Sequence, residues 1–371
     1  MLRIAFVLPE LSARPIGGAA AVYRYADELV ARGNHVTVVH PRESLLASLR
    51  DRLDRDVRLF DTSAAGTPRP SAPPDARRHP WYQFRAGVRD LVVRSLAEEW
   101  VPGSFDTTIA TNYVTLPWIR QYSPRFGRKA YFLLDYESYM IGDAAEQAGR
   151  RRAIMTGWPI IASSPAVLEL AESAGHHDVH LVPHAIDTAT FCCSVPVGSS
   201  QRTLIGFPAR SELTKRTCDA LRAVDLVRDR VPPGTGFWCF GYERIQGLQR
   251  RVAQYAGLTD SELCGLYNRS AVFVVASEWE GFGRPGAEAM ACGAALVSTR
   301  NGGVSAYATD HVNALMCSPR APGELASAIV ELMTDDQLRR SIAANGVASI
   351  RRRTWDSAVT DLEQALMTII A

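Results

Sequence analysis

The 371-residue sequence has no apolar run near the ~20 residues that a membrane-spanning helix requires. Its seven cysteines are an odd number, and no two of them form a C-x-x-C. This usage argues against a disulfide framework and is typical of a reducing compartment. The apolar stretch Met1–Leu8 is too short for a signal peptide and indicates a strand. We therefore expect a cytoplasmic protein, with peripheral contact at the inner face of a membrane left open.

An excess of charge of one sign is also missing. The 41 Lys and Arg residues balance 39 Asp and Glu residues, for a formal net charge of +2. That balance gives no field that would favour nucleic acid as a partner. No cluster of aspartates resembles a metal site, so we expect no metal. We also expect no cofactor. The length favours two domains, since single cores stop growing at about 250–300 residues.

Short apolar runs alternate with amphipathic segments in the first half of the chain, which is the pattern of an α/β fold with a parallel sheet. Strands are expected at 3–8, 35–40, 106–111, 129–134, 158–164 and 179–183, and helices at 19–32, 142–153 and 164–174. Residues 61–80, rich in Pro, Ala and Ser, predict a mobile loop. The basic amphipathic segment Trp81–Trp100 fits either a lipid-binding helix or, as we favour, a solvated one.

A second α/β pattern follows a linker at 184–200. Strands are expected at 203–207, 236–241, 271–275, 294–298 and 314–316, and helices at 218–230, from 259, and at 285–292, 322–334, 335–351 and 355–369. Thr259 and Glu262 have the spacing of a capping box. The prediction is two Rossmann-like, doubly wound domains facing a cleft, with boundaries 1–187 and 188–353 and a final helix in 354–371.

The stretch Ser277–Gly293 carries the strongest chemical signal. A buried strand leads into a loop with two glycines, and a helix is expected to start at Pro285 and end at Gly293. A Gly-rich loop at a helix N-terminus is a ready anion site. Glu280 and Glu288 flank it and could accept hydrogen bonds from hydroxyls, so the site fits a sugar nucleotide. The alternative is a plain strand-to-helix turn with two solvated glutamates.

Other candidates follow the expected strands at their carboxyl ends, where ligands bind in open α/β sheets. Gly17 and Gly18 open the first helix and are interpreted as ligand contacts rather than a tight turn alone, although that loop lacks a full G-x-G-x-x-G. Asp135 is a candidate for activating or orienting an acceptor hydroxyl, or equally a cap or turn residue. Arg210 and Lys215 would balance a diphosphate, unless they are two ordinary surface bases.

Taken together, these motifs resemble the retaining GT-B glycosyltransferases of family 4, also called glycosyl transferases group 1. The resemblance rests on Arg210-x4-Lys215, on Glu280-x7-Glu288 around Gly281-Phe282-Gly283, on Gly302-Gly303, and on Val182–Asp187 with Phe191 as an interdomain element. His184 and Ala185 replace the usual Asn-Gly, and Arg284 and Gly286 stand where many members carry apolar residues. Tyr131–Glu137 is similar to a segment of the rhamnan-synthesis rhamnosyltransferases, which suggests a deoxysugar donor.

The resemblance implies a role for each matching residue. Arg210 and Lys215 would hold the leaving diphosphate, and Glu288 would bind the ribose hydroxyls. Glu280 and the amides of Gly281, Phe282 and Gly283 would hold the donor sugar, while Gly17 and Gly18 would approach from the other side. It also implies retention of anomeric configuration, no metal, an N-terminal acceptor domain, a C-terminal donor domain and a last helix that crosses back to the first domain.

The function expected is transfer of a sugar from a UDP-, dTDP- or GDP-sugar to a hydroxyl of a saccharide, a lipid-linked saccharide or a natural product. Two alternatives stay open, a sugar-nucleotide epimerase or hydrolase on the same frame, and a non-catalytic sugar-nucleotide-binding subunit. A pair of carboxylates could also suggest a glycosidase. Because both glutamates belong to one loop–helix unit beside two cations, donor binding is the better interpretation.

Overall fold

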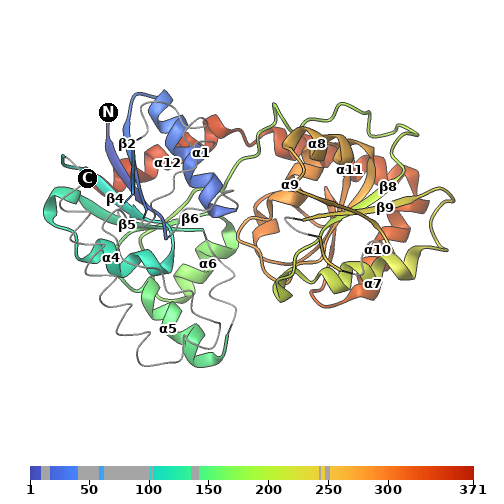
Figure 1. Ribbon diagram of the computed structural model, residues 1–371, viewed down its shortest axis with the longest axis horizontal. Helices are drawn as coiled ribbons and strands as arrows, with labels where there is room; N and C mark the ends of the chain where they lie inside the picture. The colour runs from blue at the N-terminus through green and yellow to red at the C-terminus, as the bar shows by residue number, and fades with distance from the viewer. Residues whose placement is uncertain are drawn as a thin grey trace.

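The computed structural model of the chain describes residues 1–9, 17–40, 58–61, 101, 103–134, 142–241, 244–246 and 251–371. It contains two parallel sheets, each flanked by helices (Figure 1). The expected α/β architecture of two doubly wound units is confirmed. The predicted loop after Asp61 and the predicted basic helix at 81–100 lie outside the described residues.

The first sheet has seven strands in the described ranges, in the order β3-β2-β1-β4-β5-β6-β7. Its strands are β1 Arg3–Val7, β2 His35–His40, β3 Arg58–Asp61, β4 Thr107–Ala110, β5 Arg128–Leu133, β6 Ile160–Ala162 and β7 Val179–Leu181. Its helices include α1 Gly18–Ala31, α4 Leu116–Arg120, α5 Ala144–Ile154 and α6 Pro165–Ser173. Apolar side chains of α1 pack on one face of the sheet, and those of α4 and α6 pack on the other.

The second sheet has six strands in the described ranges, in the order β10-β9-β8-β11-β12-β13. Its strands are β8 Leu204–Pro208, β9 Gly236–Gly241, β10 Ala253–Ala256, β11 Ser270–Val275, β12 Ala295–Thr299 and β13 Ala314–Cys317. The helices are α7 Thr217–Val227, α8 Asp260–Arg269, α9 Arg284–Ala291, α10 Pro322–Thr334 and α11 Asp336–Arg351. Helices α7 and α10 pack on one face, and α8 and α9 on the other (Figure 1).

The last helix, α12 (Trp355–Ile370), belongs to the core of the first sheet. Its apolar stripe, which includes Leu362 and Leu366, is buried with residues of β1, β5 and α1. Arg32 at the end of α1 donates to Glu363 at 2.7 Å, which fixes α12 beside α1 (Figure 1). The chain therefore passes between the two sheets twice, after β7 and again before α12.

Central strands match the apolar runs from which they were predicted. In β11, for example, all six residues are buried. The edge strand β10 was not predicted, since a single one of its four residues, Gln254, is buried and no apolar run marks it. The short strand β3 at the edge of the first sheet was also missed. No helix in the described part of the chain combines the length and apolar character needed to span a bilayer.

Candidate active site

A cleft of about 670 Å³ runs along the carboxyl ends of both sheets. In each sheet the order reverses beside the first strand, between β1 and β4 and between β8 and β11. Such a switch point is where open α/β sheets bind ligands. The loops after these four strands line the cleft. Its lining includes Gly17, Gly18, Thr111, Asn112, His184, Arg210, Lys215, Phe240, Leu258, Asp260, Glu280, Gly281, Phe282, Gly283, Arg284 and Glu288.

The loop between β11 and α9 is held by the segment that follows β12. The amide of Glu280 donates to Asn301 O at 2.9 Å, and the amide of Gly303 donates to Glu280 O at 3.0 Å. The two backbones approach so closely that a Cβ on Gly303 would lie 2.6 Å from Phe282 N. Only glycine fits at position 303, and Gly302 adopts φ +85°, a conformation that favours glycine. The loop backbone is thus fixed before any ligand binds.

Gly281, Gly283 and Gly286 form a G-x-G-x-x-G between a strand and a helix, which the sequence analysis did not use. Gly283 adopts φ +82° as the N-cap of α9, which begins at Arg284, one residue before the predicted start. The hydroxyl of Tyr307 donates to Gly283 O at 2.8 Å. A Cβ on Gly286 would lie 2.7 Å from that hydroxyl, so Gly286 makes room for the contact that holds the loop.

Lys215 and Glu280 form an ion pair at the cleft. Lys215 ends the 3-10 turn Leu213–Lys215 after β8, and its Nζ lies 3.0 Å from Glu280 Oε2. Their side chains are 18% and 15% exposed, so water screens the pair little. The alternative of a solvated surface lysine does not describe this geometry. An ammonium group and a carboxylate are instead placed together at the start of the Gly-rich loop.

Arg210 lies in the same cleft, at the end of β8. Its Nη1 donates to Ala209 O at 3.1 Å and to Phe240 O at 3.2 Å. The guanidinium carbon is 5.5 Å from the centre of the Phe240 ring. These contacts orient the side chain across the end of β9, the neighbouring strand. The structure thus brings Arg210, Lys215 and Glu280 together along one wall.

Glu288 is 5% exposed, and two side chains contact its carboxylate. Oε1 lies 3.0 Å from Arg284 Nη2, one helical turn away, and Oε2 accepts from the Tyr267 hydroxyl at 3.3 Å. Burial raises the pKa of Glu288, and the positive charge of Arg284 opposes that rise. The alternative of a solvated glutamate is therefore wrong for Glu288.

The opposite wall carries the N-terminal candidates. Gly17 adopts φ +53° as the N-cap of α1, a conformation that favours glycine. Gly18 packs against Leu134, since a Cβ there would lie 3.1 Å from Leu134 Cβ. Thr111 and Asn112, which follow β4, also line the cleft. Asp135 lies outside the described residues, so its proposed contact with an acceptor stays a prediction.

His184 is a cleft residue that sequence reasoning noted only as a departure from the linker motif. It is 5% exposed, and its ring lies 5.6 Å from the Phe282 ring and 5.8 Å from the Tyr25 ring. Burial lowers its pKa to about 3, and the charges of Arg284 and Arg353 act in the same direction. The imidazole is therefore neutral, and its Nδ1 is buried without a hydrogen-bond partner. The sequence signal at this position was its place in the interdomain element Val182–Asp187, which does not by itself indicate a cleft residue.

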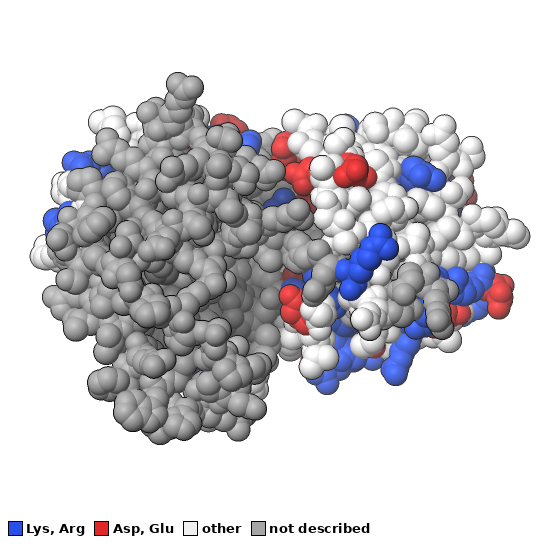
Figure 2. Space-filling model, in the orientation of Figure 1, with Lys and Arg blue, Asp and Glu red and all other residues white. Residues whose placement is uncertain are grey.

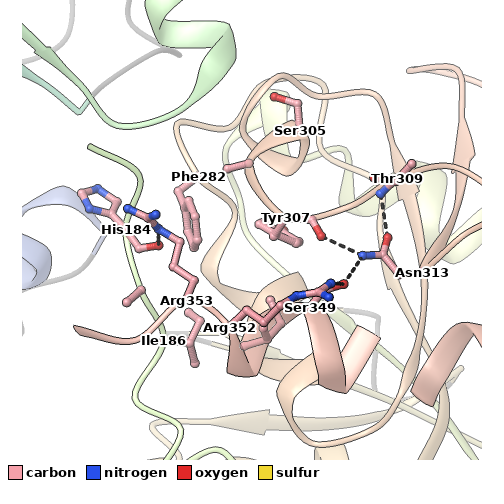
Figure 3. A pocket seen from close by; sticks show the side chains of 13 residues that line it. His184, Ile186, Phe282, Ser305, Tyr307, Thr309, Asn313, Ser349, Arg352 and Arg353 are labelled. Carbon is pink, nitrogen blue, oxygen red and sulfur yellow. Dashed lines mark hydrogen bonds between the residues drawn. The ribbon is translucent and has the colours of Figure 1, made fainter. Parts of the chain in front are cut away.

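A smaller cavity of about 250 Å³ lies where the chain crosses between the sheets, and His184 and Phe282 line both it and the cleft (Figure 3). Arg353 reaches from the end of α11 to the linker, where its Nε donates to Pro183 O at 2.8 Å and to His184 O at 3.2 Å. It also pairs with Asp361 of α12 at 3.1 Å. Arg353 therefore connects the two segments in which the chain passes between the sheets, the linker after β7 and the segment before α12.

The charge of the cleft is mixed. Among the described residues that line it, three are basic (Arg210, Lys215, Arg284) and four are acidic (Glu212, Asp260, Glu280, Glu288). Figure 2 likewise shows Lys and Arg interspersed with Asp and Glu on the visible face of the C-terminal half. Within the described residues, no three His, Cys, Asp or Glu side chains are grouped as a metal site would need. A ligand with a diphosphate and hydroxyls would match both signs of charge.

Comparison with known sequences points to one family for part of the chain. Residues 202–335 match the family model described as glycosyl transferases group 1. The chain is 28% identical over 250 residues to a D-inositol 3-phosphate glycosyltransferase of Xylanimonas cellulosilytica, covering 58% of this chain and 59% of that protein. It is 28% identical over 116 residues to O-antigen chain mannosyltransferase B of Escherichia coli, covering 31% and 30%. The chain thus spans less than two thirds of the length of these curated relatives.

Solved structures match over the whole length. Sucrose-phosphate synthase from Thermosynechococcus elongatus superposes with a TM-score of 0.78 at 16% identity, covering 100% of this chain and 99% of that one. Anabaena HepE, solved in complex with UDP-glucose, gives 0.73 at 19% identity, with 100% and 99% covered. These similarities establish that the fold is GT-B, as the sequence analysis predicted.

Proposed function

We propose that the protein is a glycosyltransferase that moves a sugar from a nucleoside-diphosphate sugar to a hydroxyl of a saccharide, a lipid-linked saccharide or a natural product. One observation carries the proposal. The cleft collects Arg210, Lys215, Glu280 and Glu288 around the N-terminus of α9, on a GT-B fold. The match of residues 202–335 to the group 1 family supports it, because that segment contains all four side chains.

The chemistry needs charge stabilisation on the leaving group. As the sugar departs, negative charge grows on the diphosphate, and fixed cations and helix N-terminal amides lower the barrier most. Arg210 and Lys215 hold the diphosphate, and Lys215 exchanges part of its contact with Glu280 for phosphate oxygens. Glu280 and the amides of residues 281–283 hold the sugar hydroxyls. Gly17 and Gly18 approach the phosphate and the acceptor from the first domain.

Glu288 binds the ribose in this proposal. Its carboxylate is buried at the cleft wall, one helical turn beyond the loop that holds the sugar. The eight-residue step between Glu280 and Glu288 then separates the sugar end of the donor from its nucleoside end.

The finer parts of the proposal follow the family resemblance. Transfer retains the anomeric configuration and uses no metal, and Asp135 contacts the acceptor. Residues 1–187 form the acceptor domain, residues 188–353 the donor domain, and residues 354–371 the returning helix. A deoxysugar donor and a peripheral contact with the inner face of a membrane complete the set.

The experiment is a thermal-shift screen of UDP-, dTDP- and GDP-sugars, followed by turnover of the hits. A donor at a hundredfold its dissociation constant stabilises the fold by about 2.7 kcal/mol. We then compare release of nucleoside diphosphate with and without saccharide acceptors. Release that depends on the acceptor supports transfer. Fast release of nucleoside diphosphate that ignores the acceptor would instead assign a hydrolase. Conversion of the donor into an epimeric sugar nucleotide without net release would assign an epimerase, and tight donor binding without any turnover would assign a binding subunit.

A further inference from the structure

Arg284 stands at the position in this motif where the sequence departs from the expected apolar residue. It is the first residue of α9, and its side chain is 39% exposed at the cleft. Its Nη2 lies 3.0 Å from Oε1 of Glu288, at the i,i+4 spacing that places two side chains on one face of a helix. The position therefore holds a cation in contact with a buried carboxylate.

The surroundings of Glu288 show what the positive charge of Arg284 does there. Its carboxylate is almost completely buried, and burial disfavours the charged form. The charged or titratable groups that face it are Arg284 on α9, Asp260 and Tyr267 on α8, Cys292 at the end of α9, and Tyr307 after β12. Arg284 is the cation in this set. Without it, the acidic neighbours and the burial would favour a protonated Glu288.

The same contacts fix the direction of the carboxylate. A carboxylate offers about four lone-pair sites, two on each oxygen. Arg284 occupies a site on Oε1 and the hydroxyl of Tyr267 a site on Oε2. Each oxygen keeps a further site, so the carboxylate can accept from two neighbouring hydroxyls of a ligand in the cleft. A vicinal diol such as that of ribose has this arrangement.

We infer that Arg284 is a positioning residue for nucleotide recognition, which holds Glu288 ionised and oriented for the two hydroxyls of the ribose. The inference rests on the nucleotide-binding part of the proposed function. It assigns to Arg284 no contact with the diphosphate. The specificity that results is for a ribonucleoside diphosphate over its 2′-deoxy form, and it depends on pH through Glu288.

The test is calorimetric titration with matched probes, which are UDP and 2′-deoxy-UDP, GDP and 2′-deoxy-GDP, and ribothymidine diphosphate and dTDP. The pair that the wild type binds most tightly is carried forward. A charge-assisted hydrogen bond to one hydroxyl predicts about a tenfold preference of the wild type for the ribo form. In Arg284→Leu this preference should be smaller than in the wild type at pH 6 and should rise toward the wild-type preference at pH 8.5, because Glu288 loses the cation that lowers its pKa.

Variants separate position from charge. Arg284→Lys keeps a cation and is expected to keep the preference at pH 6, whereas Arg284→Gln, a second neutral variant, behaves like Arg284→Leu. Glu288→Gln should lose the preference at every pH, and its titration shows how the protein binds each probe without the carboxylate. Arg320→Leu is the matched control, since Arg320 pairs with Glu278 at 2.9 Å and neither residue lines the cleft. It should titrate as the wild type does.

Each result has a distinct meaning. A wild type that binds none of the nucleoside diphosphates would overturn the proposed function and the inference with it. A wild type that binds them without ribo preference, or an Arg284→Leu that keeps the preference at pH 6, would overturn the inference and leave the transferase proposal standing. Equal weakening of both members of a pair would assign Arg284 to the diphosphate and also overturn the inference.

Discussion

Removing the ammonium group of Lys215 is the most direct test of the charge arrangement in the cleft. Lys215→Ala leaves the carboxylate of Glu280, 15% exposed, without the cation that now lies 3.0 Å away. We expect two separate effects, on folding stability and on sugar transfer. They can be distinguished because the first depends on Glu280 remaining charged, whereas the second depends on the missing cation.

The cost in stability follows from the burial of the pair. Breaking a fully buried ion pair costs about 3–5 kcal/mol, and an exposed pair contributes about 0–1 kcal/mol. With side chains 18% and 15% exposed, this pair lies between these limits, so we expect a loss of about 1–3 kcal/mol in the free energy of unfolding. The double variant Lys215→Ala/Glu280→Gln should recover most of that loss, because it leaves no uncompensated charge.

The cost in rate should be larger and should not be recovered. Loss of one fixed group that stabilises developing charge reduces kcat by about 10²-fold or more, which is about 2.7 kcal/mol of barrier. The assay measures acceptor-dependent release of nucleoside diphosphate at saturating donor, with urea denaturation in parallel and Arg320→Ala as control. If Lys215→Ala transfers sugar at the wild-type rate, Lys215 does not stabilise the leaving group, and the reasoning is refuted.

Three further predictions concern stability, measured by urea denaturation. The pKa of His184 is about 3 in the fold and 6.5 in the unfolded chain. Titration of His184 therefore leaves the free energy of unfolding unchanged above pH 6.5 and lowers it by about 1.4 kcal/mol per pH unit below pH 6.5. His184→Asn should lose less stability than the wild type between pH 7.5 and 5.5. A parallel loss in both would contradict this. Gly303→Ala should cost about 1–3 kcal/mol, because its Cβ would lie 2.6 Å from the next backbone, whereas Gly323→Ala, with nothing within 4 Å in α10, should gain about 0.5–1 kcal/mol. Equal effects would mean that the loops do not pack this closely. Leu362→Ala, fully buried in α12, should cost about 2–5 kcal/mol, and Met367→Ala, 60% exposed, about 0.5 kcal/mol or less. Similar small losses would show that α12 does not pack on the first sheet.

Much of the fold could be predicted because its signals are local. Buried parallel strands form continuous apolar runs, and β11 is one of them. The capping box of Thr259 and Glu262 is present as predicted at the start of α8, and Gly293 has the left-handed conformation expected at the end of α9. Strand β10 escaped prediction because one buried residue in four leaves no such run.

Side-chain partners in the cleft could not be predicted, because they depend on tertiary packing. The spacing of Arg284 and Glu288 is visible in the sequence, but the burial that gives their contact its strength arises from α8 and Tyr267. The pairing of Lys215 with Glu280 joins residues 65 positions apart. His184 could be recognised as a cleft residue only once the two cores were placed on either side of it.

These partners also constrain how a ligand can enter the cleft. Lys215 and Arg284 each lie against a carboxylate, so the charge of either cation is already partly balanced within the cleft. In the proposed function the diphosphate shares Lys215 with Glu280, and this exchange is favourable only if the sugar hydroxyls give Glu280 new donors at the same moment. Binding of diphosphate and binding of sugar are then coupled through one ion pair. A free nucleoside diphosphate provides no such donors, so it should bind more weakly than the intact donor, and its release after transfer is correspondingly easier.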